Sequence, residues 1–201
     1  TGATSQVTAN FTTLNSTSGC GSLVVEFQDL SIGSPTSWLW DLGNGNISTL
    51  KNPIAIYPNP GVYDVKLTVS DGIANDVKIE LAYITVFENP TANVDIATSS
   101  IGCVSHLVDF LDVSQSAATT TSWFWDFGDG GNSNVQHPTY TYLSEGLFTV
   151  SLLVTDVNSC QDLIILTDYI EVENKPITNF SADILFSCNS YQKLLNSKET
   201  A

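Results

Sequence analysis

Apolar and polar residues alternate along several short stretches of the chain, most clearly over 63–69 and again over 148–154. A period of two places the apolar side chains on one face of a β-strand and the polar ones on the other. Shorter stretches around 25–27, 38–40, 108–110 and 123–125 follow the same rule. The predicted inward residues are Val25, Phe27, Trp38, Trp40, Tyr63, Val65, Leu67 and Val69, followed by Val108, Phe110, Trp123, Trp125, Phe148, Val150, Leu152 and Val154.

The alternating pattern occurs twice, at an offset of about 85 residues. The segment WLWDLG at 38–43 corresponds to WFWDFG at 123–128, and each copy continues through a Gly/Asn/Asp-rich turn to a long strand. Such turns tolerate positive φ and end strands. The repeats predict domains at 7–88 and 91–174. Residues 177–201 are predicted to open a third repeat that stops early, and the last of them read as a tail outside the pattern.

Repeats of this length predict an all-β fold of two tandem immunoglobulin-like sandwiches. About seven short strands fit each repeat, and no helix is needed. Prolines at Pro90 and Pro176 mark the joins between repeats. Because proline fixes φ and lacks an N–H donor, strand pairing is expected to end there, leaving a semi-rigid string.

The second copy reads WFWDFGDG at 123–130 and HPTYTY at 137–142, with Gly146 before the long strand. This order closely resembles the PKD (polycystic kidney disease) domain family. The first copy is a weaker match, with Asn44 where the family has aspartate. The resemblance implies an extracellular β-sandwich, without catalysis, that serves as a spacer or contacts protein and carbohydrate. The structural motif comprises Trp38, Trp40, Asp41 and Gly43, then Trp123, Trp125, Asp126, Gly128 and Asp129.

The chain is strongly acidic, with six lysines, no arginine and a formal net charge of -15. A charge of this sign repels a phosphate backbone or an anionic membrane, so nucleic acid is excluded as a partner. The longest apolar stretch, 163–170, falls far short of the roughly 20 residues that span a bilayer. We therefore expect no membrane insertion.

Two interpretations remain open for the aspartates of the second repeat. Asp126 and Asp129 flank a glycine turn, where carboxylates commonly accept backbone N–H bonds and act as turn caps. Alternatively, they form a calcium site together with Asp156 at a strand end, because hard cations take several oxygen ligands and some PKD-like domains of collagenases bind calcium. Calcium is the one cofactor that the sequence suggests.

The cysteines suggest a disulfide within the second repeat. Cys103 precedes an inward strand and Cys160 follows the long strand, and an extracellular setting would let them pair. The first repeat has Cys20 but carries Asn75 where Cys160 falls, and Cys188 belongs to the third copy. Cys20 and Cys188 are therefore expected to be unpaired.

The two histidines do not indicate a zinc or catalytic site. His106 and His137 lack the spacing to the cysteines that zinc ligands show, and no CxxC pair exists. His137 precedes Pro138 and is expected to serve in a turn or in packing. No paired carboxylates are placed in an apolar cleft by the sequence, so we expect no enzyme.

The leading functional hypothesis is a stalk or spacer segment of a large surface adhesin, which contacts protein or glycan and neighbouring repeats of its own chain. An accessory module of a secreted polysaccharide- or protein-degrading enzyme is the alternative, and an extracellular filament subunit ranks last. Binding to a flat substrate needs exposed aromatic or apolar side chains. Phe124 and Leu39, which point opposite to the tryptophans, are the candidates.

Overall fold

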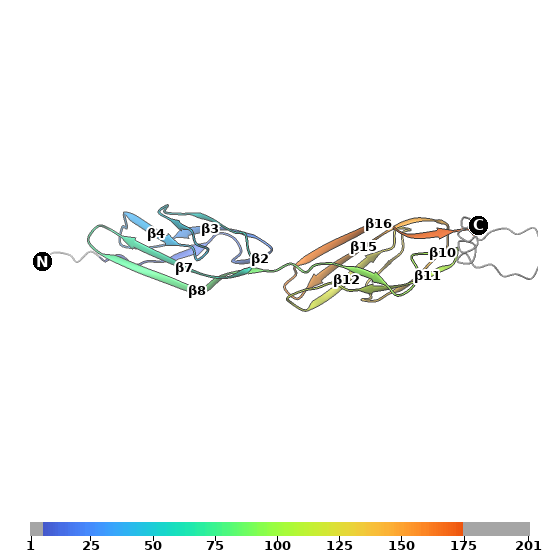
Figure 1. Cartoon of the computed structure of the whole chain (residues 1–201). Coiled ribbons are helices and arrows are strands. Elements are labelled where there is room, and N and C mark those ends of the chain that lie inside the picture. Colours follow the sequence, from blue (N-terminus) through green and yellow to red (C-terminus); the bar gives the residue numbers. More distant parts are fainter. Residues whose placement is uncertain (1–5, 175–201) are drawn as a thin grey trace, which may run out of the picture. The chain divides into compact units, whose positions relative to one another are not determined.

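The computed structural model describes residues 6–174 of the chain (Figure 1). These residues form two compact units. The first contains the chain up to Asn89 together with the short segment Asn158–Cys160, and the second contains the rest. The predicted third repeat at 177–201 lies outside the described residues.

The first unit consists of a three-stranded and a five-stranded sheet, with strand orders β1-β3-β6 and β2-β8-β7-β4-β5. The long strands β7 and β8 run side by side (Figure 1). The strands are β1 (Phe11–Thr13), β2 (Ser18–Cys20), β3 (Leu23–Asp29), β4 (Ser37–Asp41), β5 (Ile47–Ser48), β6 (Ile54–Tyr57), β7 (Gly61–Ser70) and β8 (Asn75–Phe87).

The second unit has the same plan, with sheet orders β14-β11-β9 and β10-β16-β15-β12-β13. Its long pair is β15 and β16 (Figure 1). The strands are β9 (Val94–Ile96), β10 (Ile101–Cys103), β11 (His106–Asp112), β12 (Thr120–Asp126), β13 (Asn132–Ser133), β14 (Thr139–Tyr142), β15 (Gly146–Asp156) and β16 (Gln161–Glu173).

Neighbouring strands are antiparallel with one exception in each unit. β2 pairs in parallel with the end of β8, and β10 pairs in parallel with the end of β16. The all-β prediction of two tandem immunoglobulin-like sandwiches is therefore confirmed. Residues 6–174 contain no helix, and so none long and apolar enough to cross a membrane.

The core of the first unit lies between its two sheets around Trp40, which is fully buried. The Phe27 ring from β3 lies 5.4 Å from the Trp40 ring, and the Phe11 ring from β1 lies 5.2 Å away. β7 supplies Val65 and Leu67, whose side chains have no exposed surface. Aromatic pairs at these separations add about 0.5–1.5 kcal/mol beyond the burial of their area.

The core of the second unit is built around Trp125 and Phe127, both essentially inaccessible to solvent. Phe110 from β11 lies 5.5 Å from Trp125 and 5.2 Å from Phe127, centroid to centroid. The predicted inward residues of β15 are buried as well. They are Phe148, Val150, Leu152 and Val154.

Each long strand pair contains a bulge at the same place. In the first unit the register of β7 and β8 shifts at Asp64, opposite Ala82, whose φ is 51°. The Ala82 N–H donates to Asp64 Oδ1 over 2.7 Å, which supports this strained backbone. In the second unit Asp168, with φ at 50°, donates its N–H to Thr149 Oγ1 instead.

The glycine of the WxWDxG motif is required by the turn that follows the tryptophan strand. Gly43 and Gly128 have φ of 74° and 84°. A Cβ at Gly43 would lie 2.1 Å from the Asp64 carbonyl oxygen, and one at Gly128 would lie 2.4 Å from that of Thr149. The turn thus packs directly against the backbone of the bulge, where no side chain fits.

Candidate functional site

The carboxylates of the second-repeat turn are occupied by backbone hydrogen bonds. Asp126 Oδ1 accepts the Gly128 N–H over 2.9 Å, and Asp129 Oδ1 accepts the Gly131 N–H over 3.0 Å. These are the two-residue bonds of Asx turns, as the turn-cap interpretation expects. Both carboxylates therefore fix the shape of the loop.

Two tyrosines of β14 join the loop to the sandwich. Tyr140 donates its hydroxyl to both oxygens of Asp129, over 2.8 and 3.0 Å. Burial and, next, this bond raise the pKa of Tyr140 to about 12. Tyr142 donates to the Phe127 carbonyl over 3.1 Å, and burial together with the charge of Asp129 raises its pKa well above the usual range.

The third calcium candidate, Asp156, lies at the other end of the sheet. It pairs with Thr120 at the start of β12, whereas Asp126 is the last residue of that strand. Six residues of extended chain correspond to about 20 Å. Asp126, Asp129 and Asp156 therefore share no site. No cluster of three His, Cys, Asp or Glu side chains suited to a metal occurs within residues 6–174.

The first repeat closes its turn with an amide in place of a carboxylate. Asp41 Oδ1 accepts the Gly43 N–H over 3.1 Å, as its counterpart does in the second repeat. Asn44 Oδ1 accepts the Asn46 N–H over 3.0 Å, and its amide donates to the Ile56 carbonyl over 2.9 Å. In the first repeat Asn44 thus donates to β6 itself. In the second repeat the bond runs the other way, because the Tyr140 hydroxyl of β14 donates to Asp129.

A half-buried aspartate of β11, absent from the sequence-based candidates, anchors the first tryptophan of the second motif. Asp112 Oδ2 accepts from Trp123 Nε1 over 2.6 Å and from Gln136 Nε2 over 3.1 Å, while Oδ1 accepts the Ser114 N–H over 3.0 Å. Burial raises the pKa of Asp112, but these hydrogen bonds outweigh it and leave the pKa below its usual value. The repeat offers a signal, since Asp29 occupies the matching position.

The histidines have structural roles. His137 Nδ1 accepts the backbone N–H of Asp112 over 3.1 Å, and His106 Nε2 donates to the Ser99 carbonyl over 2.9 Å. His137 is therefore the turn and packing residue that the sequence predicts.

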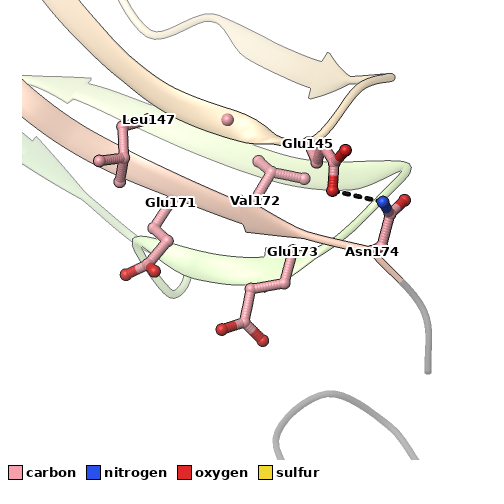
Figure 2. Close-up of a pocket in the computed structure, with 7 residues that line it drawn as sticks. Glu145, Leu147, Glu171, Val172, Glu173 and Asn174 are labelled. Atoms are coloured by element: carbon pink, nitrogen blue, oxygen red, sulfur yellow. Dashed lines mark hydrogen bonds between the residues drawn. The ribbon is translucent and has the colours of Figure 1, made fainter.

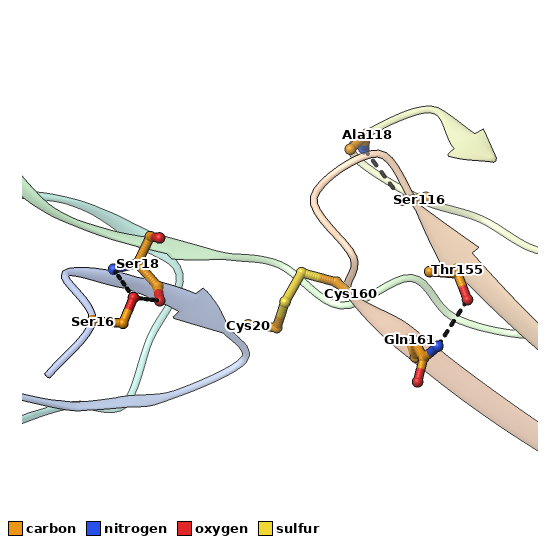
Figure 3. The surroundings of a disulfide bond; sticks show 8 residues. All are labelled: Ser16, Ser18, Cys20, Ser116, Ala118, Thr155, Cys160 and Gln161. Carbon is orange, nitrogen blue, oxygen red and sulfur yellow. Dashed lines mark hydrogen bonds between the residues drawn. A yellow bond between two sulfur atoms is a disulfide. The ribbon is translucent and has the colours of Figure 1, made fainter.

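The disulfide pairing differs from the prediction. Cys160 is bonded to Cys20, with their Cα atoms 5.5 Å apart (Figure 3). Cys103 is disulfide-bonded as well, but not to Cys160. The predicted Cys103–Cys160 bond and the predicted unpaired Cys20 are both wrong. Cys188 lies outside the described residues.

Strand geometry explains why the predicted pair cannot form. Cys103 lies opposite Glu173, the last residue of β16, whereas Cys160 comes just before Gln161, the first. The length of β16 separates them, about 40 Å at 3.3 Å per residue. A disulfide requires Cα atoms within about 7 Å.

The outer face of each five-stranded sheet carries a row of uncharged residues. In the second repeat the row is Phe124, Leu153 and Leu163, which lie opposite one another on β12, β15 and β16. Phe124 is 46% exposed and Leu163 52%. We call this set the outer row of the second repeat.

The first repeat has an equivalent outer row, formed by Leu39, Thr68 and Val77. Leu39 is 47% exposed and Val77 44%. Phe124 and Leu39 therefore lie where the sequence predicts, on the face opposite the core. These rows offer flat, uncharged and largely apolar contact surfaces on an acidic chain.

Two open hollows of the surface are lined in part by charged residues. One lies at the end of the second unit beside Glu145, Glu171 and Glu173 (Figure 2). Asn174 donates to Glu145, while Glu171 and Glu173 point away from that bond (Figure 2). The other, in the first unit, is lined by residues around the first turn, including Asp41, Gly43, Asp64 and Lys66.

Known proteins resemble parts of this chain. A microbial collagenase of Vibrio alginolyticus is 38% identical over 74 residues, 36% of this chain and 9% of the collagenase. Collagenase ColA of Bacillus cereus is 40% identical over 58 residues, 29% of this chain and 6% of ColA. The chain thus matches less than a tenth of either relative.

A solved structure, the PKD1 domain of the Vibrio cholerae metalloprotease PrtV, is 29% identical, covering 42% of this chain and 98% of that domain with a TM-score of 0.37. The family model described as PKD domain matches residues 5–86 and again 88–172, one match for each repeat. The two matches together take in nearly all of the described residues, and the chain therefore belongs to the PKD domain family.

Proposed function

We propose that this chain is a non-catalytic spacer and interaction segment of a larger protein outside the cell, in the manner of a surface adhesin stalk. The observation that carries the proposal is the repetition of one complete sandwich. Each repeat has its own closed core and its own match to the PKD model. Units that each bury their own core can be strung together in any number.

The acidic charge limits which proteins or glycans this chain can contact. With a formal charge of -15, the chain repels anionic polymers and like-charged copies of itself. The outer rows, in contrast, are uncharged, and that of the second repeat presents apolar side chains in register across three strands. A neutral or basic partner with a flat face fits this surface.

A spacer depends on the number of repeats and not on their identity. We would display one repeat, the natural pair, or two copies of the second repeat between a cell anchor and a peptide tag, with serine for cysteine throughout. Beads should capture the tag more often with two repeats than with one. The natural pair and the duplicated second repeat should give equal capture. Capture that ignores repeat number, or fails with the duplicated repeat, would refute the spacer role.

The collagenase relatives favour a second candidate, an accessory module that holds an enzyme against an insoluble protein. For this role the outer row of the second repeat supplies the contact, because Phe124 is its exposed aromatic side chain. Aromatic side chains give large contact areas at low entropic cost.

Cosedimentation with fibrillar collagen tests the accessory role. Phe124→Ser should lower binding at least fivefold, while Leu143→Ser, at a 73% exposed apolar position off the row, should leave binding unchanged. Equal binding by the Phe124 variant and the parent chain would reject the outer row as the contact surface. Absence of collagen binding in the parent chain would leave the spacer as the remaining role.

A further inference from the structure

We infer that the Cys20–Cys160 disulfide takes most of the chain out of the path of a stretching force. The bond joins two residues 140 positions apart. Tension applied to the two ends of the chain follows the shortest covalent route between them. With the bond formed, that route runs from Cys20 across the two sulfurs to Cys160, so the backbone of the enclosed residues is bypassed and cannot be pulled straight.

The enclosed stretch contains the bulk of both folds. It includes every strand from β3 to β15, with the buried Trp40 and Trp125 at the centres of the two cores. The described strands outside it are β1, β2 and β16. Tension can therefore pull on these terminal strands without drawing out the strands of the enclosed stretch.

The connectivity sets how far the chain can be drawn out. An extended residue spans about 3.3–3.6 Å. Residues 6–174 would reach roughly 600 Å if all were extended, but only about 30 of them lie outside the disulfide loop, and these reach roughly 100 Å. Formation of the bond thus reduces the maximum extension about sixfold and hides roughly 500 Å of chain.

The load that remains falls on a well-paired strand. β16 pairs with β15 over nine registered positions and with β10 at its far end. In the bonded chain tension enters β16 at its first residues, because Cys160 directly precedes Gln161. Since β16 is already extended between Cys160 and Glu173, tension along it adds little length and does not require its separation from β15.

This inference goes beyond the proposed function and does not depend on it. An accessory module beside an enzyme and a stalk on a cell would both acquire the same limit on extension. A stretching experiment reads length under force, and therefore its failure would leave the spacer and collagen-binding experiments untouched.

The experiment compares two variants in magnetic tweezers, tethered at their ends. Both carry Cys103→Ser and Cys188→Ser, so that a single disulfide is read. The first keeps Cys20 and Cys160, and the second replaces both with serine. We expect the second to lengthen roughly 500 Å more than the first when fully unfolded.

A second measurement on the bonded variant tests the inference even if the serine variant fails to fold. The bonded variant is held under tension and dithiothreitol is then added, which reduces the disulfide in the same molecule. A further lengthening of roughly 500 Å is expected after reduction. Equal lengths for the two variants, with no step on reduction, would overturn the inference.

Discussion

The two repeats place a tryptophan and an aspartate at the same position but connect them differently. In the second repeat Trp123 Nε1 donates to Asp112 Oδ2 over 2.6 Å. In the first repeat the buried Trp38 Nε1 has no hydrogen-bond partner among residues 6–174, and Lys51 Nζ lies 5.5 Å from the centre of its ring. Lys51 Nζ is also 3.9 Å from Asp29 Oδ2. A hydrogen bond from the indole in one repeat is thus replaced by lysine contacts in the other.

The shared part of the two sites is the backbone cap. Asp29 Oδ1 accepts the Ser31 N–H over 3.0 Å, and Asp112 Oδ1 accepts the Ser114 N–H over 3.0 Å. Both repeats use the aspartate to close the chain at the end of β3 and β11. The second oxygen of each carboxylate contacts a side chain from a later loop, Lys51 in the first repeat and Gln136 in the second.

Removing Asp112 should have the largest effect on stability. Asp112→Ala takes the acceptor from Trp123, Gln136 and the Ser114 N–H together, and should cost about 2–4 kcal/mol of second-repeat stability. Asp29→Ala should cost about half as much, because it breaks one backbone bond and a weak ion pair. Hydrogen exchange read by mass spectrometry separates the repeats. Equal losses in both would show that the Trp123 bond contributes nothing.

The two tryptophans should respond differently to the loss of their N–H. Trp123→Phe removes a hydrogen bond to a charged acceptor and should destabilise the second repeat by about 1.5–3 kcal/mol. Trp38→Phe removes a donor that has no partner among the described residues. Only the smaller size of the phenylalanine ring should therefore destabilise the first repeat, by about 1 kcal/mol. Urea unfolding of each variant measures the difference. A larger loss for Trp38→Phe would contradict the hydrogen-bond assignment.

Acid should weaken the second repeat through Asp112. Its pKa in the folded chain lies below the unfolded value of about 3.9, so the stabilisation is complete above that value and is lost as pH falls through the folded pKa. Between pH 5 and pH 2 the parent chain should lose more second-repeat stability than Asp112→Asn. Acid unfolding of the two proteins in parallel measures this difference. An equal or larger loss in Asp112→Asn would contradict the role given to Asp112.

The smallest effect should come from the lysine of the first repeat. Lys51 is 58% exposed at its side chain, so its contacts with Asp29 and Trp38 are screened by salt. Lys51→Gln copies the residue of the second repeat and should change first-repeat stability by no more than about 0.5 kcal/mol. Repeating the unfolding at molar salt should remove even that difference. A salt-independent loss would point to packing of the lysine stem.

The strands and cores follow from local patterns that the sequence displays openly. Alternation predicts Val65, Leu67 and Val69 as inward residues, and all three are buried. The motif tryptophans Trp40 and Trp125 fill the cores because alternate residues of a strand share its inner face. Strand positions and inward residues depend on residues close together in the sequence, so the sequence alone predicts them.

The site predictions that are wrong depend on the direction in which strands run. Asp126 and Asp156 each end a strand, but β12 and β15 are antiparallel, so their ends lie at opposite edges of the sheet. Cys103 and Cys160 fall within one repeat, which favours pairing between them on spacing alone, yet Cys160 pairs with Cys20. Such contacts arise from topology, which residue spacing does not encode.

The sheet orders also bear on how similar repeats avoid sticking to one another during synthesis. The strands that end each sheet order in the described chain are two to four residues long, and β2 and β10 pair with only the last three positions of β8 and β16. Long open edges are templates for pairing with another chain. Tandem copies keep a high local concentration of similar strands, which favours domain-swapped misfolding. The remaining lengths of β8 and β16 are such edges, and each carries charged residues and a bulge, which are the features that discourage pairing with another strand. These features allow an array to be made as one continuous chain.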